Sequence, residues 1–178
     1  VVTNANGKGA PALGRVRSAV WLEGSAREAV HHLKYGGWHG MARTLAAAMQ
    51  GLEPLERGAV LVPIPLGAAR RRSRGYNQAE VLAEALGRAA ALDVRPDLLR
   101  RARETRSQTA LAPSARAANV HAAFMAAGTP PDRLVLVDDV CTTGATLIAA
   151  AEALVAAGAT RVEAVTFARA PLPVPGSM

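Results

Sequence analysis

The sequence is poor in cysteine, in aromatic residues and in long apolar runs. Cys141 is its single cysteine, which excludes a disulfide within the chain and a zinc site built on several cysteines. Only two Trp, two Tyr and two Phe are present, so the core must rest on Val, Leu, Ile and Ala. The most apolar helical stretch, residues 147–159, is interrupted by Glu152 and is shorter than the ~18 residues of a membrane span. We therefore expect no membrane span.

The ends of the sequence differ in composition from its middle. The first residues, VVTNANGKGAPALG, lack the charged start and apolar centre of a secretory signal, which predicts a flexible leader at 1–14 and a cytoplasmic location. A proline-rich segment predicts a flexible tail at 171–178. Between them, residues 15–170 are long enough to bury a core and show no convincing linker, so we expect one domain.

The net charge of +7 is concentrated in two short arginine-rich segments. One holds Arg70, Arg71, Arg72 and Arg74; the other holds Arg100, Arg101, Arg103 and Arg106, offset by Glu104. Together they carry the whole excess, so the rest of the chain is neutral. Arginine grips phosphate through two parallel hydrogen bonds, so the clusters indicate a local polyanion as ligand.

Strand and helix patterns alternate along the chain, which predicts an α/β domain with a largely parallel sheet. We expect strands at 16–22, 59–63, 120–125, 133–138 and 161–168, and helices at 25–33, 40–50, 77–92 and 145–157. Residues 63–76 and 93–113 are predicted to be irregular loops.

The clearest buried strand, Leu134–Val137, leads into an acidic pair and then into a turn of small residues. Asp138 and Asp139 fall at the carboxyl end of the strand, where parallel sheets bind ligands. The turn that follows opens into a helix whose N-terminal amides can hold an anion; its residues are Thr142, Thr143, Gly144, Ala145 and Thr146. Acids would repel a bare phosphate but can accept hydrogen bonds from ribose hydroxyls, so the joint pattern predicts a sugar phosphate, bridged by Mg²⁺. Helix capping by the acids is the simpler alternative.

Five sequence segments together resemble a known family. LVLVDDVCTTGAT at 134–146 is similar to the phosphoribosyl pyrophosphate (PRPP) motif of type I phosphoribosyltransferases. The other segments, similar to the competence protein F (ComF/GntX-like) family, are LKYGG at 33–37, VPIP at 62–65, RRRSRGYNQAEVLAEAL at 70–86 and SQTALAPSARAANVHAAF at 107–124. The resemblance implies a three-layer, Rossmann-like type I phosphoribosyltransferase fold with a mainly parallel central sheet and a small hood. The family's cysteine-rich zinc-binding N-terminal segment has no counterpart here.

The resemblance also implies roles for the two arginine clusters. Pyrophosphate would lie against the segment after the second strand, through Arg70, Arg71, Arg72, Arg74 and Asn77. Asn77 is in addition expected to cap the next helix. A mobile loop would close over the reacting centre with Arg103, Arg106, Gln108, Arg116 and Asn119. A solvated basic loop and an ordinary surface loop are the respective alternatives.

Three functions remain open on this basis. The first is an enzyme that moves a phosphoribosyl group from PRPP to a small nitrogen acceptor with Mg²⁺, in which Asp138 and Asp139 orient the ribose. The second is a factor of DNA uptake that binds single-stranded DNA and works with a competence helicase or other uptake proteins. The third is a PRPP sensor without turnover. The four histidines have no ligand spacing, so Mg²⁺ is expected through PRPP beside the acidic pair and not in a side-chain cluster.

Overall fold

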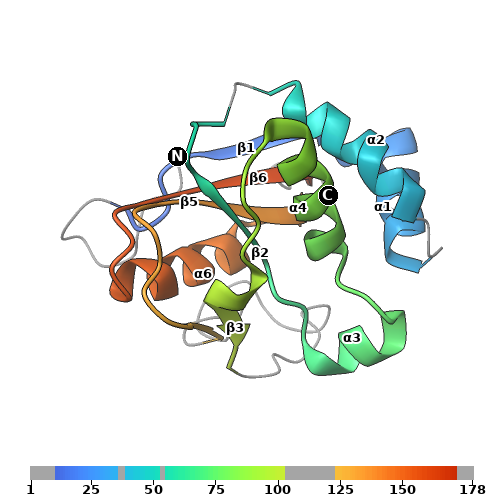
Figure 1. Cartoon of the computed structure of the whole chain (residues 1–178). Helices are drawn as coiled ribbons and strands as arrows, with labels where there is room; N and C mark the ends of the chain where they lie inside the picture. The colour runs from blue at the N-terminus through green and yellow to red at the C-terminus, as the bar shows by residue number, and fades with distance from the viewer. Residues whose placement is uncertain (1–10, 36–38, 53–54, 103–122, 172–178) are drawn as a thin grey trace, which may run out of the picture.

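A parallel four-stranded sheet forms the centre of the protein (Figure 1). The computed structural model describes residues 11–35, 39–52, 55–102 and 123–171. Across the sheet the strands follow the order β1-β6-β5-β2, and every neighbouring pair is parallel. Their bounds are Val16–Trp21 for β1, Arg161–Arg169 for β6, Arg133–Cys141 for β5 and Val60–Pro63 for β2. All four carboxyl ends therefore lie at one edge of the sheet, and the α/β class is confirmed.

Helices cover both faces of the sheet and give the protein three layers (Figure 1). One face carries α1 (Gly24–Tyr35), α2 (His39–Gln50) and α4 (Gln78–Ala90). The other carries α6 (Ala145–Ala156) and a two-stranded antiparallel sheet of β3 (Leu99–Arg101) and β4 (Phe124–Ala126). The short helices α3 (Ala68–Arg74) and η1 (Pro96–Leu98) complete the described elements.

Strand β5 is one of the two inner strands of the sheet, with a strand on each side and a packed layer on each face. Leu134 and Leu136 pack into the cluster on the α6 face, whereas Val135 and Val137 pack into the cluster on the α2 and α4 face. This two-sided burial is why the strand is a continuous apolar run without alternation. The position of the strand also sets the position of Asp138 and Asp139, which follow Val137 directly.

The outer edge of β2 is covered by the chain that leaves α4. Leu61 donates its N–H to the carbonyl of Asp93 at 2.8 Å and accepts from the N–H of Arg95 at 2.9 Å. These bonds make an isolated parallel bridge between Leu61 and Val94. The open hydrogen-bonding groups of an edge strand are thereby satisfied, and the chain passes from one face of the sheet to the other.

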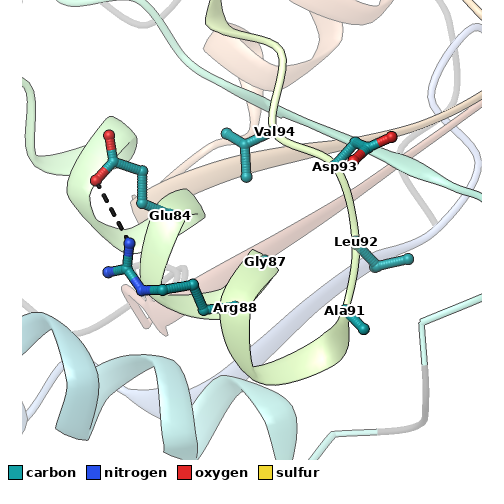
Figure 2. Close-up of a pocket in the computed structure, with 7 residues that line it drawn as sticks. All are labelled: Glu84, Gly87, Arg88, Ala91, Leu92, Asp93 and Val94. Carbon is teal, nitrogen blue, oxygen red and sulfur yellow. Dashed lines mark ion pairs between the residues drawn. The ribbon is translucent and has the colours of Figure 1, made fainter.

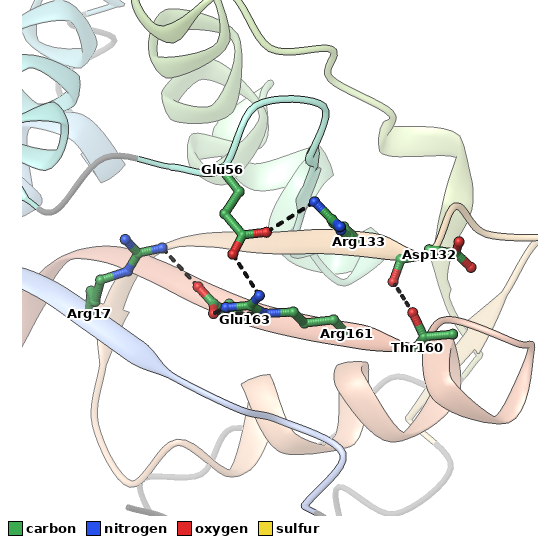
Figure 3. A network of polar contacts seen from close by, with 7 residues as sticks. All are labelled: Arg17, Glu56, Asp132, Arg133, Thr160, Arg161 and Glu163. Atoms are coloured by element: carbon green, nitrogen blue, oxygen red, sulfur yellow. Dashed lines mark hydrogen bonds and ion pairs between the residues drawn. The ribbon is translucent and has the colours of Figure 1, made fainter.

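Ion pairs join the strands at the opposite, amino-terminal edge of the sheet (Figure 3). Glu56 lies 2.6 Å from Arg161 and 3.4 Å from Arg133. Glu163 in turn lies 2.7 Å from Arg161 and 3.0 Å from Arg17. These ion pairs link β1, β5 and β6 to one another and to the chain before β2.

The predicted loop at 63–76 contains a helix, so that prediction is wrong in part. Helix α3 spans Ala68–Arg74 and ends at Gly75, whose φ of 79° is left-handed and whose N–H donates to the carbonyl of Arg71 at 2.8 Å. Alanine and arginine are strong helix formers, and a left-handed glycine is a common helix stop. Prolines and clustered charge suggested a loop, and helix propensity outweighed them.

Other expected boundaries also shift in the structure. The leader was expected to reach residue 14, yet Leu13 is buried in the core and Gly14 donates its N–H to the carbonyl of Val162 at 2.9 Å. The expected irregular segment 93–113 contains η1 and β3. Residues 1–10, 103–122 and 172–178 lie outside the described part of the chain. No helix in the described ranges is long and apolar enough to cross a membrane.

Gly87 in α4 provides a test of the packing between this helix and the chain that covers β2. A Cβ added at Gly87 would lie 2.6 Å from Cγ2 of Val94 and 2.8 Å from the carbonyl oxygen of Leu92. We expect Gly87→Ala to lower the free energy of unfolding by about 2 kcal/mol, because backbone has to move. Gly40→Ala is the matched control, because Gly40 is also helical and has nothing within 4 Å of an added Cβ. Equal unfolding midpoints in urea for the two variants would contradict this packing.

Candidate functional site

The two acids predicted to orient a ribose lie within the last residues of β5. Asp139 is only 4% exposed, and Asp138 is half-buried. The Oδ1 atom of Asp138 accepts a hydrogen bond from the backbone N–H of Asp139 at 2.8 Å. Burial, together with the neighbouring Asp139 carboxylate, raises the pKa of Asp138 well above its usual value. A cation or a set of hydroxyl donors at this point would relieve the repulsion between the two carboxylates.

Lys34, near the end of α1, reaches the more buried of the two acids. Its Nζ atom lies 2.8 Å from Oδ2 of Asp139, and the two side chains are 24% and 5% exposed. The atoms are close but not aligned as a hydrogen bond, so we regard the contact as an ion pair. Nζ also attracts the carboxylate of Asp138, which opposes the rise of its pKa. The ion pair therefore places a positive charge directly beside the enclosed carboxylate of Asp139.

The predicted phosphate loop connects β5 directly to α6. Thr142 and Thr143 are exposed, Gly144 is buried with a left-handed φ of 80°, and α6 begins at Ala145. No side chain caps the helix; Oγ1 of Thr143 makes only a long contact of 3.4 Å with the N–H of Ala145. The first-turn N–H groups of α6 and two threonine hydroxyls thus face the carboxyl edge of the sheet, an arrangement that suits an anion. Thr146 is half-buried in this first turn.

The first arginine cluster lies on α3, which no layer of the core buries. Arg71 pairs with Glu80 at 3.3 Å, and Arg74 donates to Oε1 of Gln78 at 3.0 Å. Arg70 and Arg72 are exposed and have no side-chain partner within the described ranges. Because β2 leads into α3 from the carboxyl edge, the cluster lies on the same side of the sheet as the acids (Figure 1).

The C-terminal end of α1 joins the acidic pair to the arginine helix. Arg74 donates to the hydroxyl of Tyr35 at 3.3 Å, and its guanidinium lies 5.0 Å from the centre of that ring. The hydroxyl of Tyr76 donates to the carbonyl of Leu33, and the next residue, Lys34, contacts Asp139. Leu33, Lys34 and Tyr35 of α1 therefore contact the acidic pair on one side and the end of the arginine helix on the other.

Asn77 occupies its predicted capping position and is fully committed inside the protein. Its Oδ1 accepts from the N–H of Ala79 at 3.1 Å, which caps α4 as expected. Its Nδ2 donates to the carbonyl of Ile64 at 3.0 Å, and the residue is 1% exposed. The side chain thus fixes the loop between β2 and α4, and both of its polar atoms are occupied without a ligand.

Some predicted site residues cannot be placed, and others emerge only from the structure. The mobile-loop candidates lie outside the described residues: Arg103, Arg106, Gln108, Arg116 and Asn119. Cys141 is buried, and burial raises the pKa of its thiol, which fits a packing role. The contact of Lys34 with Asp139 was missed because only folding brings α1 beside β5. The LKYGG segment at 33–37, similar to the competence protein F family, was the available signal.

The described residues do not form a metal site by themselves. No group of three or more His, Cys, Asp or Glu side chains converges within the described ranges. The acidic pair of β5 supplies two carboxylates, so a divalent cation beside it would draw most of its oxygen ligands from the bound substrate and water. This donor set fits Mg²⁺ carried by a pyrophosphate and does not fit a protein-only cage.

We expect Lys34→Met to destabilise the protein because Asp139 would lose its counter-charge. The expected loss is roughly 2–3 kcal/mol in the free energy of unfolding, somewhat below that for a fully buried pair because Lys34 retains solvent contact. The double variant Lys34→Met with Asp139→Asn removes both charges and should regain most of the loss. Arg43→Met, on the exposed face of α2, is the control for loss of a positive charge. Additive effects of the two changes in urea unfolding would show that the ion pair does not operate.

Comparison with known proteins agrees with this geometry. A phosphoribosyl transferase domain model matches residues 45–173, which is well over half of the chain. The chain is also 37% identical over 91 residues to Competence protein F of Haemophilus influenzae, a match that covers 49% of this chain and 40% of that protein. The shared region thus spans less than half of that relative. The chain belongs to the phosphoribosyl transferase domain family and is similar, over about half its length, to competence protein F.

Proposed function

We propose that this protein binds PRPP with Mg²⁺ at the carboxyl edge of its sheet and transfers the phosphoribosyl group to a nitrogen acceptor, releasing pyrophosphate. The observation that carries the proposal is the convergence of three features at that edge. These are the buried acidic pair of β5, the uncapped start of α6 and the exposed arginines of α3. PRPP has a part for each feature. Its 5-phosphate suits the start of α6, its ribose suits the acidic pair, and its pyrophosphate suits the arginines of α3.

Each feature has a separate task in binding. The N–H groups of α6 and the hydroxyls of Thr142 and Thr143 would hold the 5-phosphate. Asp138 and Asp139 would accept hydrogen bonds from the ribose hydroxyls, which fixes the orientation of the ring. Arg70 and Arg72, whose guanidinium groups have no partner among the described residues, would contact the pyrophosphate.

The transfer step forms one bond and breaks one. The lone pair of the acceptor nitrogen forms a bond to C1 of the ribose while the bond from C1 to the pyrophosphate oxygen breaks. The electron pair of that bond leaves with the pyrophosphate, and the proton of the nitrogen passes to solvent. In the transition state, positive charge develops on the ribose ring. The carboxylates of Asp138 and Asp139 lie close to the ring and stabilise this charge. Asp138 and Asp139 lie where they would help to hold Mg²⁺ that arrives with the substrate, and the ion would supply positive charge against the leaving pyrophosphate.

Replacing both acids tests the binding site. We expect the double variant Asp138→Asn, Asp139→Asn to lose about 3 kcal/mol of Mg²⁺-PRPP binding, roughly a hundredfold in Kd, because two charge-assisted interactions are lost. Isothermal titration calorimetry on folded protein measures this directly. Asp132→Asn is the matched control, because Asp132 is an exposed acid just before the other end of β5. An unchanged Kd in the double variant would refute the site.

Turnover is tested separately from binding. Pyrophosphate release from Mg²⁺-PRPP, followed across a panel of nitrogen heterocycles and amines, should occur with one class of acceptor and stop in the Asp138→Asn, Asp139→Asn variant. Tight binding of PRPP without release for any acceptor would favour a PRPP sensor over an enzyme. The fold and the binding site would be unaffected by that result.

Single-stranded DNA binding is the second candidate, favoured by the solvent-exposed position of Arg70 and Arg72 on α3 and by the similarity to competence protein F. Under this proposal, a fluorescent oligothymidylate should bind with a steep salt dependence and should lose affinity in Arg70→Gln, Arg72→Gln. Arg57→Gln, an exposed arginine in the turn before β2, is the control. Binding that survives the loss of the acidic pair would separate the DNA role from the PRPP role. Equal binding by the Arg70, Arg72 and Arg57 variants would contradict α3 as the DNA site.

A further inference from the structure

The two edge strands of the central sheet differ in how their outer sides are covered. At the β2 edge, Leu61 exchanges two backbone hydrogen bonds with the chain that leaves α4, at Asp93 and Arg95. Figure 2 shows this chain beside α4, where the two line a hollow of about 380 Å³ with the ion pair of Glu84 and Arg88 on its rim. At the opposite edge, β1 has β6 on one side and no strand on the other among the described residues. Within those residues, β1 is therefore the open edge of the sheet.

Strand β1 lacks the features that usually protect an open edge. Every second residue of an edge strand directs its N–H and C=O away from the sheet, where they can pair with a further strand. The strand contains neither proline nor lysine, and the side chain of its one charged residue, Arg17, lies 3.0 Å from Glu163 of β6. At its end, Val20 and Trp21 are 36% and 59% exposed. Backbone groups and apolar surface are thus both available for a further strand.

The symmetry of an antiparallel pair restricts how β1 can meet a second copy of itself. Directly opposite residues in such a pair are of the same type, either both hydrogen-bonded or both not. These types alternate along a strand, so two copies related by a two-fold axis must bring together residues whose numbers add to an even total. The register centred on Ala19, near the middle of β1, meets this condition. Residues equally far before and after Ala19 then lie opposite each other.

The register centred on Ala19 also matches opposite charges at both ends of the strand. Arg15 lies four residues before Ala19, Glu23 lies four residues after it, and both are exposed. Arg15 of each copy therefore comes opposite Glu23 of the other, and the two-fold axis makes this contact occur twice. Trp21 comes opposite Arg17 on the same face of the sheet, where the exposed indole ring can cover the aliphatic stem of the arginine. The edge is complementary to itself in charge, in shape and in backbone hydrogen bonds.

We propose that the protein forms a two-fold dimer in which β1 pairs antiparallel with β1 of a second copy, centred on Ala19. The two four-stranded sheets become one continuous sheet. Because the strands of the two copies run in opposite directions, the two carboxyl edges point to opposite ends of the dimer, and neither candidate site is covered. One strand pair makes a small interface, so we expect a Kd on the order of 10 µM. This inference goes beyond the proposed function and does not depend on it.

Sedimentation of the full chain tests the dimer. The measured mass should rise from 18.4 kDa toward twice that value as the concentration increases from about 1 to about 100 µM. Arg15→Glu and Glu23→Arg each place like charges opposite each other twice, so each should weaken the dimer at least about tenfold. Glu28→Arg and Arg57→Glu reverse exposed charges outside β1 and should leave the dimer unchanged. A mass that stays at 18.4 kDa throughout would overturn the proposal.

Mixing the two weakened variants tests the register. The Arg15→Glu chain has acids at both positions, and the Glu23→Arg chain has arginines at both, so a mixed pair regains both contacts. We expect an equimolar mixture to form dimers at a concentration where each variant alone is monomeric. This rescue also shows that both variants are folded. A mixture that dimerises no better than its separate components would overturn the pairing of Arg15 with Glu23.

Hydrogen exchange identifies what covers β1. Amide exchange at residues 16–21 should slow as the concentration rises through the Kd of the dimer, whereas the enclosed amides of β5 should exchange at the same rate throughout. Exchange at β1 that is slow in the monomer and independent of concentration would show that the chain itself covers this edge. That result would overturn the second copy as its partner.

Discussion

The contact between Lys34 and Asp139 is the interaction on which the carboxyl edge depends. Strand β5 runs through the interior of a parallel sheet, and Asp138 and Asp139 lie near its carboxyl end. The side chain of Asp139 is still buried at this point. An ionised carboxylate in that position is unfavourable by several kcal/mol unless a positive charge approaches it. Lys34 supplies that charge at 2.8 Å. Because Lys34 lies on α1, the ion pair ties the end of that helix to β5, and the next residue, Tyr35, contacts Arg74 of α3.

The two edges of the sheet have different physical roles. At the amino edge, Glu56 and Glu163 form ion pairs with Arg17, Arg133 and Arg161, and these pairs join the strands. At the carboxyl edge, charged groups are left without partners in the described part of the chain, as in Arg70, Arg72 and Arg169. A parallel sheet gathers the carboxyl ends of its strands on one side, and these arginines lie on that side.

Much of this arrangement could be predicted from the sequence, because it depends on local patterns. The apolar run of β5, the acids that follow it and the small residues before α6 define a strand, an acidic pair and a turn into a helix without knowledge of distant contacts. Asn77 as a cap of α4 is equally local. The nature of α3 was less clear, since the prolines before it and its clustered charges argued for a loop, and the helix propensity of alanine and arginine decided the outcome.

The long-range contacts could not be predicted in the same way. Lys34 meets Asp139, and Trp21 meets Arg169, only because β1 and α1 are placed beside strands from the far end of the chain. No periodicity or spacing encodes the strand order that makes them neighbours. The roles of Arg103 to Asn119 stay predictions, because these residues lie outside the described part of the chain. The central claim is most directly tested by a crystal structure of the protein grown with Mg²⁺ and PRPP. The account predicts the 5-phosphate on residues 142–146, the ribose hydroxyls on Asp138 and Asp139, and the pyrophosphate toward α3; PRPP bound at any other face would contradict it.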